Sequence, residues 1–222
     1  MSRVAPTTAQ AMADHWSARA HRFDAAASHI RHPEEWKRVL KAALGEAPRD
    51  VIDLGAGTGA CALIAAELGH RATAVDGSEG MLAYARESAA RKGLSIRFIH
   101  ATMDDANLAE VSADVVTMRN VLWTLEHPKA ALDLARRLLR PGRTLLISDG
   151  LWREPGNESE AVEMFGAPLP YYNGLTEEDG RKLLTEAGFV NIKPWHGHFA
   201  INPYDPSGQI PYFVLTGEAT PA

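Results

Sequence analysis

The sequence predicts an α/β fold, a parallel and doubly wound sheet with helices on both faces. Short β-rich runs alternate with segments of helical periodicity, and the links between them are short. Of the 222 residues, 45% are hydrophobic and 23% are charged, which suffices for a buried core and excludes a wholly disordered chain. We therefore expect a single domain over residues 1–222.

The first two thirds of the chain show a regular succession of predicted elements. A helix is expected over residues 32–45, because Pro33 suits a first turn and Gly45 suits a helix end. Ser78 is expected to cap a later helix that ends at Gly93. The other elements expected up to residue 148 are strands over 51–54, 71–75, 95–99, 114–118 and 143–148, and helices over 58–68 and from Pro128 onward.

Residues 151–175 interrupt this alternation. The segment is too long for an ordinary connection and contains several aromatic residues, so we expect it to serve the function. Thr176 and Asp179 then resemble a capping box, with Asp in place of the usual Glu or Gln. Two last strands are predicted near 190–195 and 212–217. Because no helical pattern separates them, they should pair as a hairpin at the sheet edge.

Composition argues against several classes of function. The net charge is −5, and no run of Lys and Arg could follow a phosphate backbone, so nucleic acid is not an expected partner. The longest apolar stretch, residues 60–66, is far shorter than the roughly 18 residues of a membrane span, so no membrane function is expected. Residues 1–20 lack the apolar core of a signal peptide, and the single cysteine, Cys61, cannot form an internal disulfide. We expect a cytoplasmic protein in which Cys61 is a core residue.

The most informative segment is a glycine-rich loop at residues 53–59, Asp-Leu-Gly-Ala-Gly-Thr-Gly. It follows a predicted strand and precedes a predicted helix, so its backbone can approach a ligand near the free N–H groups of the helix. Asp76 stands at the end of the next strand, where a carboxylate can accept hydrogen bonds from both hydroxyls of a ribose. A tight turn alone would not explain both features, so we predict a nucleotide-type cofactor.

The identity of that cofactor is open on these residues. Gly55, Gly57 and Ala60 fit the G-x-G-x-x-G/A pattern of dinucleotide binding. Against this, the carboxylate of Asp53 would repel a diphosphate and attract a cationic amino group. No tyrosine in the chain has a lysine four residues later, so the usual catalytic pair of short-chain dehydrogenases is absent.

These residues resemble the class I S-adenosylmethionine-dependent methyltransferases, in their small-molecule branch. The resemblance runs from about Trp16 to Gly217 and includes Pro141-Gly142 before the fifth strand. It implies a Rossmann-like sheet of seven strands, mostly parallel with the last antiparallel. It also implies a set of cofactor-binding residues: Trp16, Arg19, Asp53, Gly55, Gly57, Asp76, Gly77, Met81, Thr102, Met103 and Arg119.

The roles of these residues follow from the resemblance. Asp53 would face the methionine amino group, and the backbone carbonyl of Arg119 would meet the same ammonium. Met81 would pack on the adenine. Thr102 stands where the family often has Asp, so the expected contact to the adenine passes to the backbone N–H of Met103.

The segment 16–24 resembles the family's lid helix, W-D-x-x-A-x-x-Y-D, with Ser17 and Phe23 in place of Asp and Tyr. In relatives this helix closes over the methionine end of the cofactor, which makes Arg19 a candidate partner for the carboxylate. Alternatively, Trp16 and Phe23 only make core contacts. We expect four parts: an N-terminal lid helix (1–31), a cofactor-binding core (32–150), a substrate lid insertion (151–175), and a last helix with the edge hairpin (176–222).

Methyl transfer from a sulfonium requires mainly orientation and the exclusion of water. A general base is needed only if the acceptor must lose a proton, and His127 and Asp149 are the candidate catalytic residues, with His15, His196 and His198 as further possibilities. The last two would share a face of a predicted strand. No third ligand accompanies them, so no metal is expected.

The methyl acceptor is expected to contact aromatic and sulfur-containing side chains beyond the strand ends. The alternative is that these side chains bury one another or contact a dimer partner. The predicted acceptor-binding residues are His15, Trp123, Trp152, Met164, Phe165, Tyr171 and Tyr172.

The sequence thus predicts S-adenosylmethionine-dependent methyl transfer to an oxygen or nitrogen of a small apolar or aromatic molecule. The reaction would be a direct displacement that releases S-adenosylhomocysteine, by a monomer or a homodimer. The alternatives are a quinone-type C-methyltransferase, an NAD-dependent oxidoreductase and a cofactor-binding module without catalysis.

Overall fold

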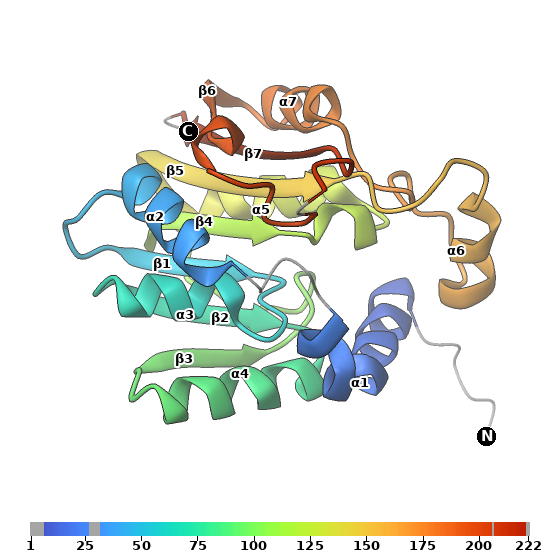
Figure 1. Cartoon of the computed structure of the whole chain (residues 1–222), viewed down its shortest axis with the longest axis horizontal. Coiled ribbons are helices and arrows are strands. Elements are labelled where there is room, and N and C mark those ends of the chain that lie inside the picture. The colour runs from blue at the N-terminus through green and yellow to red at the C-terminus, as the bar shows by residue number, and fades with distance from the viewer. Residues whose placement is uncertain (1–6, 27–31, 206, 221–222) are drawn as a thin grey trace.

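The computed structural model describes residues 7–26, 32–205 and 207–220, which form one seven-stranded sheet with helices on both faces (Figure 1). The sheet order is β3-β2-β1-β4-β5-β7-β6. Strands β1 to β5 are parallel, and β7 runs antiparallel to both of its neighbours. The predicted fold class is therefore confirmed. The strands are β1 (Asp50–Leu54), β2 (Arg71–Asp76), β3 (Ile96–His100), β4 (Ala113–Arg119), β5 (Leu139–Gly150), β6 (Phe189–Pro194) and β7 (Tyr212–Ala219).

Two apolar layers hold the helices against the sheet. Helices α2 (Pro33–Leu44) and α3 (Ala60–Glu67) bury Trp36, Leu40 and Ile64 in one layer, which also takes Leu82 from α4 (Glu79–Arg91). Helices α5 (Pro128–Leu138) and α7 (Glu177–Glu186) build the other layer with the side chains of Leu132 and Leu184. Apolar side chains three and four positions apart make these helices amphipathic, so each can bury one face against the strands.

Two helices lie beyond the carboxyl ends of the parallel strands. These are α1 (Thr8–Ala26) and α6 (Glu158–Phe165), which contact each other at the right-hand end of the sheet in Figure 1. α1 also packs on α4. Residues 1–6 and 27–31 of the predicted lid segment lie outside the described residues. No helix among the described residues is long and apolar enough to cross a bilayer.

The two ends of the insertion at residues 151–175 lie next to each other at the end of β5. The N–H of Leu175 donates to the carbonyl oxygen of Gly150 (2.8 Å), and that of Trp152 donates to Asn173 (2.9 Å). Leu151 and Gly174 also form an isolated bridge. A loop whose ends are paired is anchored to β5, and the remainder of the insertion, including α6, extends over the strand ends.

Three local predictions were wrong. Strand β5 begins at Leu139, ahead of Pro141-Gly142, because Leu139 pairs with Ala113 before the register shifts. Helix α3 begins at Ala60, two residues after its predicted start at Thr58, because Gly59 adopts a left-handed backbone (φ 88°). The segment His196–His198 is a 3₁₀ turn and not part of a strand. β6 and β7 do pair, but residues 195–211 between them make a long excursion.

The capping box predicted at α7 is present. The Thr176 hydroxyl accepts from the N–H of Asp179 (3.1 Å), and the Asp179 carboxylate accepts from the N–H of Thr176 (2.9 Å). We expect Thr176→Ala to lower the free energy of unfolding by about 1 kcal/mol, since it removes a helix cap. Thr185→Ala, at an exposed site in the last turn of the same helix, should change it by less than about 0.5 kcal/mol. Urea unfolding of both variants checks this, and equal losses would contradict it.

Candidate active site

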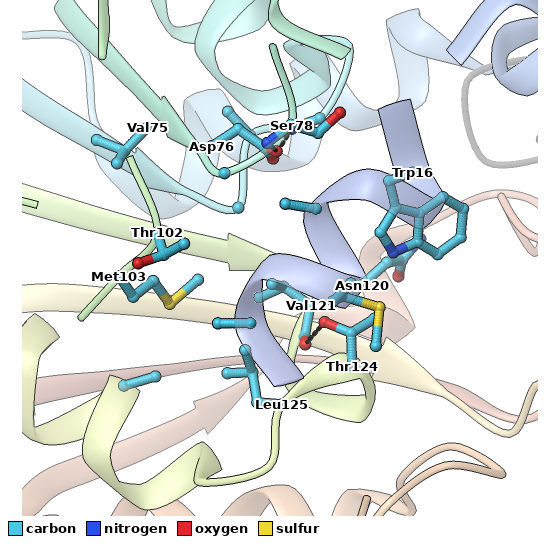
Figure 2. Close-up of a pocket in the computed structure, with 18 of the residues that line it drawn as sticks. Trp16, Val75, Asp76, Ser78, Thr102, Met103, Asn120, Val121, Thr124 and Leu125 are labelled. Carbon is cyan, nitrogen blue, oxygen red and sulfur yellow. Dashed lines mark hydrogen bonds between the residues drawn. The ribbon is translucent and has the colours of Figure 1, made fainter. Parts of the chain in front are cut away.

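A cavity of about 1050 Å³ opens at the carboxyl ends of the central strands. Its walls are α1, the glycine loop, the end of β2, the segments after β3 and β4, and side chains from the insertion and the β6–β7 excursion. Figure 2 shows Asp76, Met103 and Val121 on different sides of this cavity, with α1 crossing it. Every residue predicted to bind the cofactor lines it: Trp16, Arg19, Asp53, Gly55, Gly57, Asp76, Gly77, Met81, Thr102, Met103 and Arg119.

The glycine loop leaves no room for side chains at its start. Gly55 has a left-handed backbone (φ 68°), and a Cβ there would overlap the side chain of Val121. Gly57 is also left-handed (φ 57°), and nothing lies within 4 Å of its Cβ position. The loop therefore turns sharply at Gly55 and presents bare backbone to the cavity at Gly57, as close approach to a ligand requires.

Asp53 places a buried carboxylate at the end of β1. It is 2% exposed and accepts hydrogen bonds from the Thr117 hydroxyl (2.6 Å) and the N–H of Ala62 in α3 (3.0 Å). Burial raises the pKa of Asp53 to about 6, against the opposing effects of these bonds and of nearby Arg119. Ionisation of Asp53 is thus unfavourable in the absence of a cation and becomes favourable when a cation lies beside the carboxylate.

Asp76 connects two loops at the end of β2. Its carboxylate accepts from the N–H of Gly57 and from the N–H of Ser78, both at 2.7 Å, and the second bond is drawn in Figure 2. Burial raises the pKa of Asp76, while the two backbone donors oppose that shift. Ser78 caps α4 as predicted, because its hydroxyl accepts from the N–H of Met81 (3.1 Å).

The α1 helix closes one side of the cavity through Trp16. The Trp16 ring meets the rings of Phe23 (5.7 Å) and Trp123 (6.0 Å) edge to face. The helix is tied to the core by a hydrogen bond between the hydroxyls of Ser17 and Ser78 (2.8 Å). Trp16 therefore makes aromatic core contacts and also lines the cavity, while its closure over the cofactor stays a prediction.

Arg119 extends from β4 into an aromatic surrounding that the sequence did not indicate. Its guanidinium lies 4.0 Å from the centroid of a Trp36 ring and 6.0 Å from that of Tyr204. Tyr204 and Ile210, both from the β6–β7 excursion, also line the cavity. No local sequence pattern marks these two residues. They reach the cavity through the long-range pairing of β6 with β7.

The predicted acceptor-binding residues divide into two groups. Trp123 and Trp152 line the cavity, whereas five others lie outside its lining. Tyr172 (1% exposed) and Phe165 (4%) are buried in the core behind Trp123, while Met164 on α6 is 43% exposed. The five are His15, Met164, Phe165, Tyr171 and Tyr172.

The other groups considered for proton transfer also differ in position. The ring of His15 packs on Phe165 (5.1 Å) and contacts Arg19 (3.0 Å), and its pKa is lowered by burial and by neighbouring arginines. His127 is at the exposed rim of the cavity. Asp149 is fully buried and does not line the cavity. His196 pairs with Glu177 (3.5 Å) at the far side of α7's first turn, and the described residues contain no cluster of potential metal ligands.

Comparison with known proteins identifies the domain around this cavity. Residues 52–147 match the family described as "Methyltransferase domain". The chain is 32% identical over 152 residues to a ubiquinone biosynthesis O-methyltransferase of Dinoroseobacter shibae, covering 64% of this chain and 60% of that protein. It is 35% identical over 117 residues to the tRNA 5-carboxymethoxyuridine methyltransferase of Escherichia coli K12, covering 51% and 44%. The chain thus spans about half the length of these relatives.

Solved structures share the whole fold. The 1,6-didemethyltoxoflavin-N1-methyltransferase of Burkholderia thailandensis, solved with its substrate and S-adenosylhomocysteine, superposes with a TM-score of 0.69 at 22% identity, covering 100% of this chain and 93% of that one. Residues 52–147 of this chain therefore form a methyltransferase domain, and the whole chain shares the fold of that solved enzyme. This family uses S-adenosylmethionine as its methyl donor, in agreement with the predicted cofactor.

The cavity fits such a donor. S-adenosylmethionine carries an ammonium and a sulfonium but no phosphate, and the buried carboxylate of Asp53 and the half-buried carboxylate of Asp76 both line the cavity that would hold it. A dinucleotide would bring its negative diphosphate to the same glycine loop, next to Asp53. Asp53, Asp76 and the backbone of Gly57 are the groups suited to the amino acid and ribose portions.

Asp53 should make cofactor binding depend on pH. A carboxylate with a pKa of about 6 is neutral in more acidic solution, where it no longer attracts an ammonium. We expect the affinity for S-adenosylhomocysteine, measured by calorimetry, to be constant from pH 8 to 7 and to fall by up to about tenfold per pH unit below 6. Asp53→Asn should bind more weakly at pH 8 and lose affinity less steeply toward pH 5. Parallel profiles of the two proteins would contradict this role.

Proposed function

We propose that this protein transfers the methyl group of S-adenosylmethionine to an oxygen or nitrogen of a small apolar or aromatic molecule. S-adenosylhomocysteine would be the second product. The observation that carries the proposal is one cavity lined by two chemically different groups: the carboxylates of Asp53 and Asp76 beside the glycine loop, and tryptophans from α1, the segment after β4 and the insertion.

The size of the cavity supports two adjacent ligands. A volume of about 1050 Å³ lies at the upper limit of the range usual for a single small ligand. Asp53, Asp76 and Met81 line the end suited to the cofactor. Trp16, Trp123 and Trp152 also line the cavity, and their flat apolar rings favour a flat apolar acceptor.

The contribution of the protein to the reaction is mainly orientation and dehydration. When bound, S-adenosylmethionine supplies a carbon already activated by the sulfonium, so the acceptor's lone pair forms the new bond as the carbon–sulfur pair returns to sulfur. Asp53 and Asp76 would hold the donor from two adjacent strands. Trp16 of α1 would exclude water from the methyl group.

The proton of an acceptor such as a phenol needs a path to solvent or to a base. His127, with a side chain 77% exposed at the cavity rim, is placed to accept it directly or through water. An acceptor already ionised in solution needs no base, because the electron pair that attacks is free from the start.

A quinone-type carbon acceptor remains the second candidate. The chain is 33% identical over 120 residues to a relative of Sinorhizobium fredii that is named a ubiquinone/menaquinone biosynthesis C-methyltransferase, and an aromatic cavity end suits a quinol ring. The position of the new methyl group distinguishes the two, since carbon methylation leaves the hydroxyls of the product free.

The first experiment is a screen of phenols, carboxylic acids, amines and quinols with methyl-labelled S-adenosylmethionine. We expect label in at least one aromatic phenol or amine and a stoichiometric yield of S-adenosylhomocysteine. Calorimetric titration with S-adenosylhomocysteine and with NADH belongs to the same test. Binding of NADH without binding of S-adenosylhomocysteine would overturn the proposal in favour of a dehydrogenase.

Asp76→Asn tests the ribose end of the site. The amide keeps one acceptor oxygen for the glycine loop or for Ser78, but not both, and loses the charge that favours ribose hydroxyls. We expect the affinity for S-adenosylhomocysteine to fall by about 10- to 100-fold. Asp24→Asn makes the same chemical change on an exposed face of α1 and should leave the affinity within about twofold. Full affinity in Asp76→Asn would exclude the assigned ribose contact.

A further inference from the structure

Asp149 at the end of β5 is a buried carboxylate that the proposed reaction does not use. Its residue is 0% exposed, and it forms no ion pair with any residue that the structure describes. Its Oδ1 accepts from the indole N–H of Trp152 (2.6 Å) and from the N–H of Gly150 (3.0 Å). Its Oδ2 accepts from the N–H of Trp123 (3.4 Å). A single side chain thus joins two segments that lie far apart in the sequence.

Those two segments are the walls of the acceptor end. Trp123 follows β4 and Trp152 opens the insertion, and both line the cavity, whereas Asp149 does not. The Trp152 ring is confined from the other side by Tyr204, at a centroid distance of 5.0 Å, and Tyr204 is itself bound through its hydroxyl to Ser148 (2.8 Å). The Trp152 ring therefore donates its indole N–H to Asp149 and packs edge to face with Tyr204.

The bond to Trp152 is of the strong kind. A carboxylate that accepts an indole N–H at 2.6 Å makes a charge-assisted hydrogen bond, which is shorter and stronger than a neutral one. The cost is a carboxylate removed from water, and burial raises the pKa of Asp149 to about 7. A buried aspartate destabilises the fold unless hydrogen-bond donors lie close to its carboxylate. The Asp149 carboxylate therefore fixes the orientation of the groups that donate to it.

We propose that Asp149 is a positioning residue that sets the shape of the acceptor end of the cavity by holding Trp152 and the Trp123 segment in register. Asp149 acts through these tryptophans and does not touch the acceptor. The inference rests on the proposed function, because it requires that the cavity binds a methyl acceptor beside the cofactor. It replaces a role in proton transfer, which the burial of Asp149 behind Trp152 disfavours.

The test uses the full-length chain with saturating S-adenosylhomocysteine and 1-naphthol as an aromatic probe. Asp149→Asn keeps the size of the side chain but replaces one acceptor oxygen by a donor. Trp152→Phe keeps a ring and removes the indole N–H. Trp195→Phe is the matched control, since its indole donates to Thr216 (2.9 Å) and does not line the cavity. The two tryptophan variants also assign their indole signals in a ¹H–¹⁵N spectrum.

In Asp149→Asn we expect the Trp152 indole proton to move upfield and the affinity for 1-naphthol to fall by about tenfold, with the affinity for S-adenosylhomocysteine changed less than about twofold. Trp152→Phe should lose a similar amount, and the double variant no more than the larger single loss, because both break one contact. Trp195→Phe should bind 1-naphthol normally. Once an acceptor is known, its KM should rise in Asp149→Asn more than kcat falls.

Two results would overturn the proposal. One is an unmoved Trp152 signal in Asp149→Asn, and the other is unchanged binding of 1-naphthol in both Asp149→Asn and Trp152→Phe. A wild-type protein that binds neither S-adenosylhomocysteine nor 1-naphthol refutes the proposed function instead, and the Trp152 signal still decides whether Asp149 holds that ring. Melting temperatures of all variants separate local effects from loss of the fold.

Discussion

The cavity depends first on the carboxylate of Asp76, which accepts one backbone N–H from each of two loops. The bonds from Gly57 and Ser78 fix the glycine loop of β1 against the start of α4. The hydroxyl of Ser78 is also hydrogen-bonded to the hydroxyl of Ser17, which holds α1 against the same loops. Without a buried acceptor at this point, two backbone donors would lose their partners and three segments of the cavity wall would lose their common support.

The parallel register of the sheet explains why a second carboxylate lies nearby. Asp53 pairs with Ala74 on β2 and with Thr117 on β4, so it ends β1 close to where Asp76 ends β2. Each charge opposes the ionisation of the other, and Asp76 contributes to the raised pKa of Asp53. Two buried acids at one sheet edge are unfavourable in an empty protein and become favourable beside a cationic ligand. The ligand and the fold are therefore linked through the same pair of side chains.

The features that could be predicted from the sequence are mostly formed by residues that lie close together in the chain. The glycine loop, Asp76, the Ser78 cap and the capping box at Thr176 are each defined by residues within a few positions of one another, and the structure shows them as expected. The seven-stranded sheet with an antiparallel last strand followed from the family resemblance and is confirmed, whereas the strand order comes from the structure. The assignment of roles to the cofactor residues stays a prediction, although all of them line one cavity.

The sequence could not reveal features that depend on long-range contacts. Tyr204 reaches the cavity only because β7 inserts between β5 and β6 and returns the excursion to the strand ends. Aromatic composition likewise predicted that the insertion contacts the acceptor, but it could not tell Trp152, which lines the cavity, from Tyr172, which is buried behind it. Composition indicates what a segment buries, and only packing decides which side chain faces a ligand.

The two ends of the cavity are therefore built on different principles. The proposed cofactor end is held by backbone groups and two carboxylates, where almost any change of atom breaks a hydrogen bond. The proposed acceptor end is held by rings in mutual contact: Trp123 contacts both Trp16 and Tyr172, and Arg153 stacks on both Trp123 (4.5 Å) and Tyr172 (4.3 Å). Packing of this kind tolerates substitution if volume is conserved, and it changes shape when one ring moves. Buried Asp149 accepts hydrogen bonds from both tryptophan segments, which is why its effect should reach both tryptophans while leaving Asp53 and Asp76 untouched.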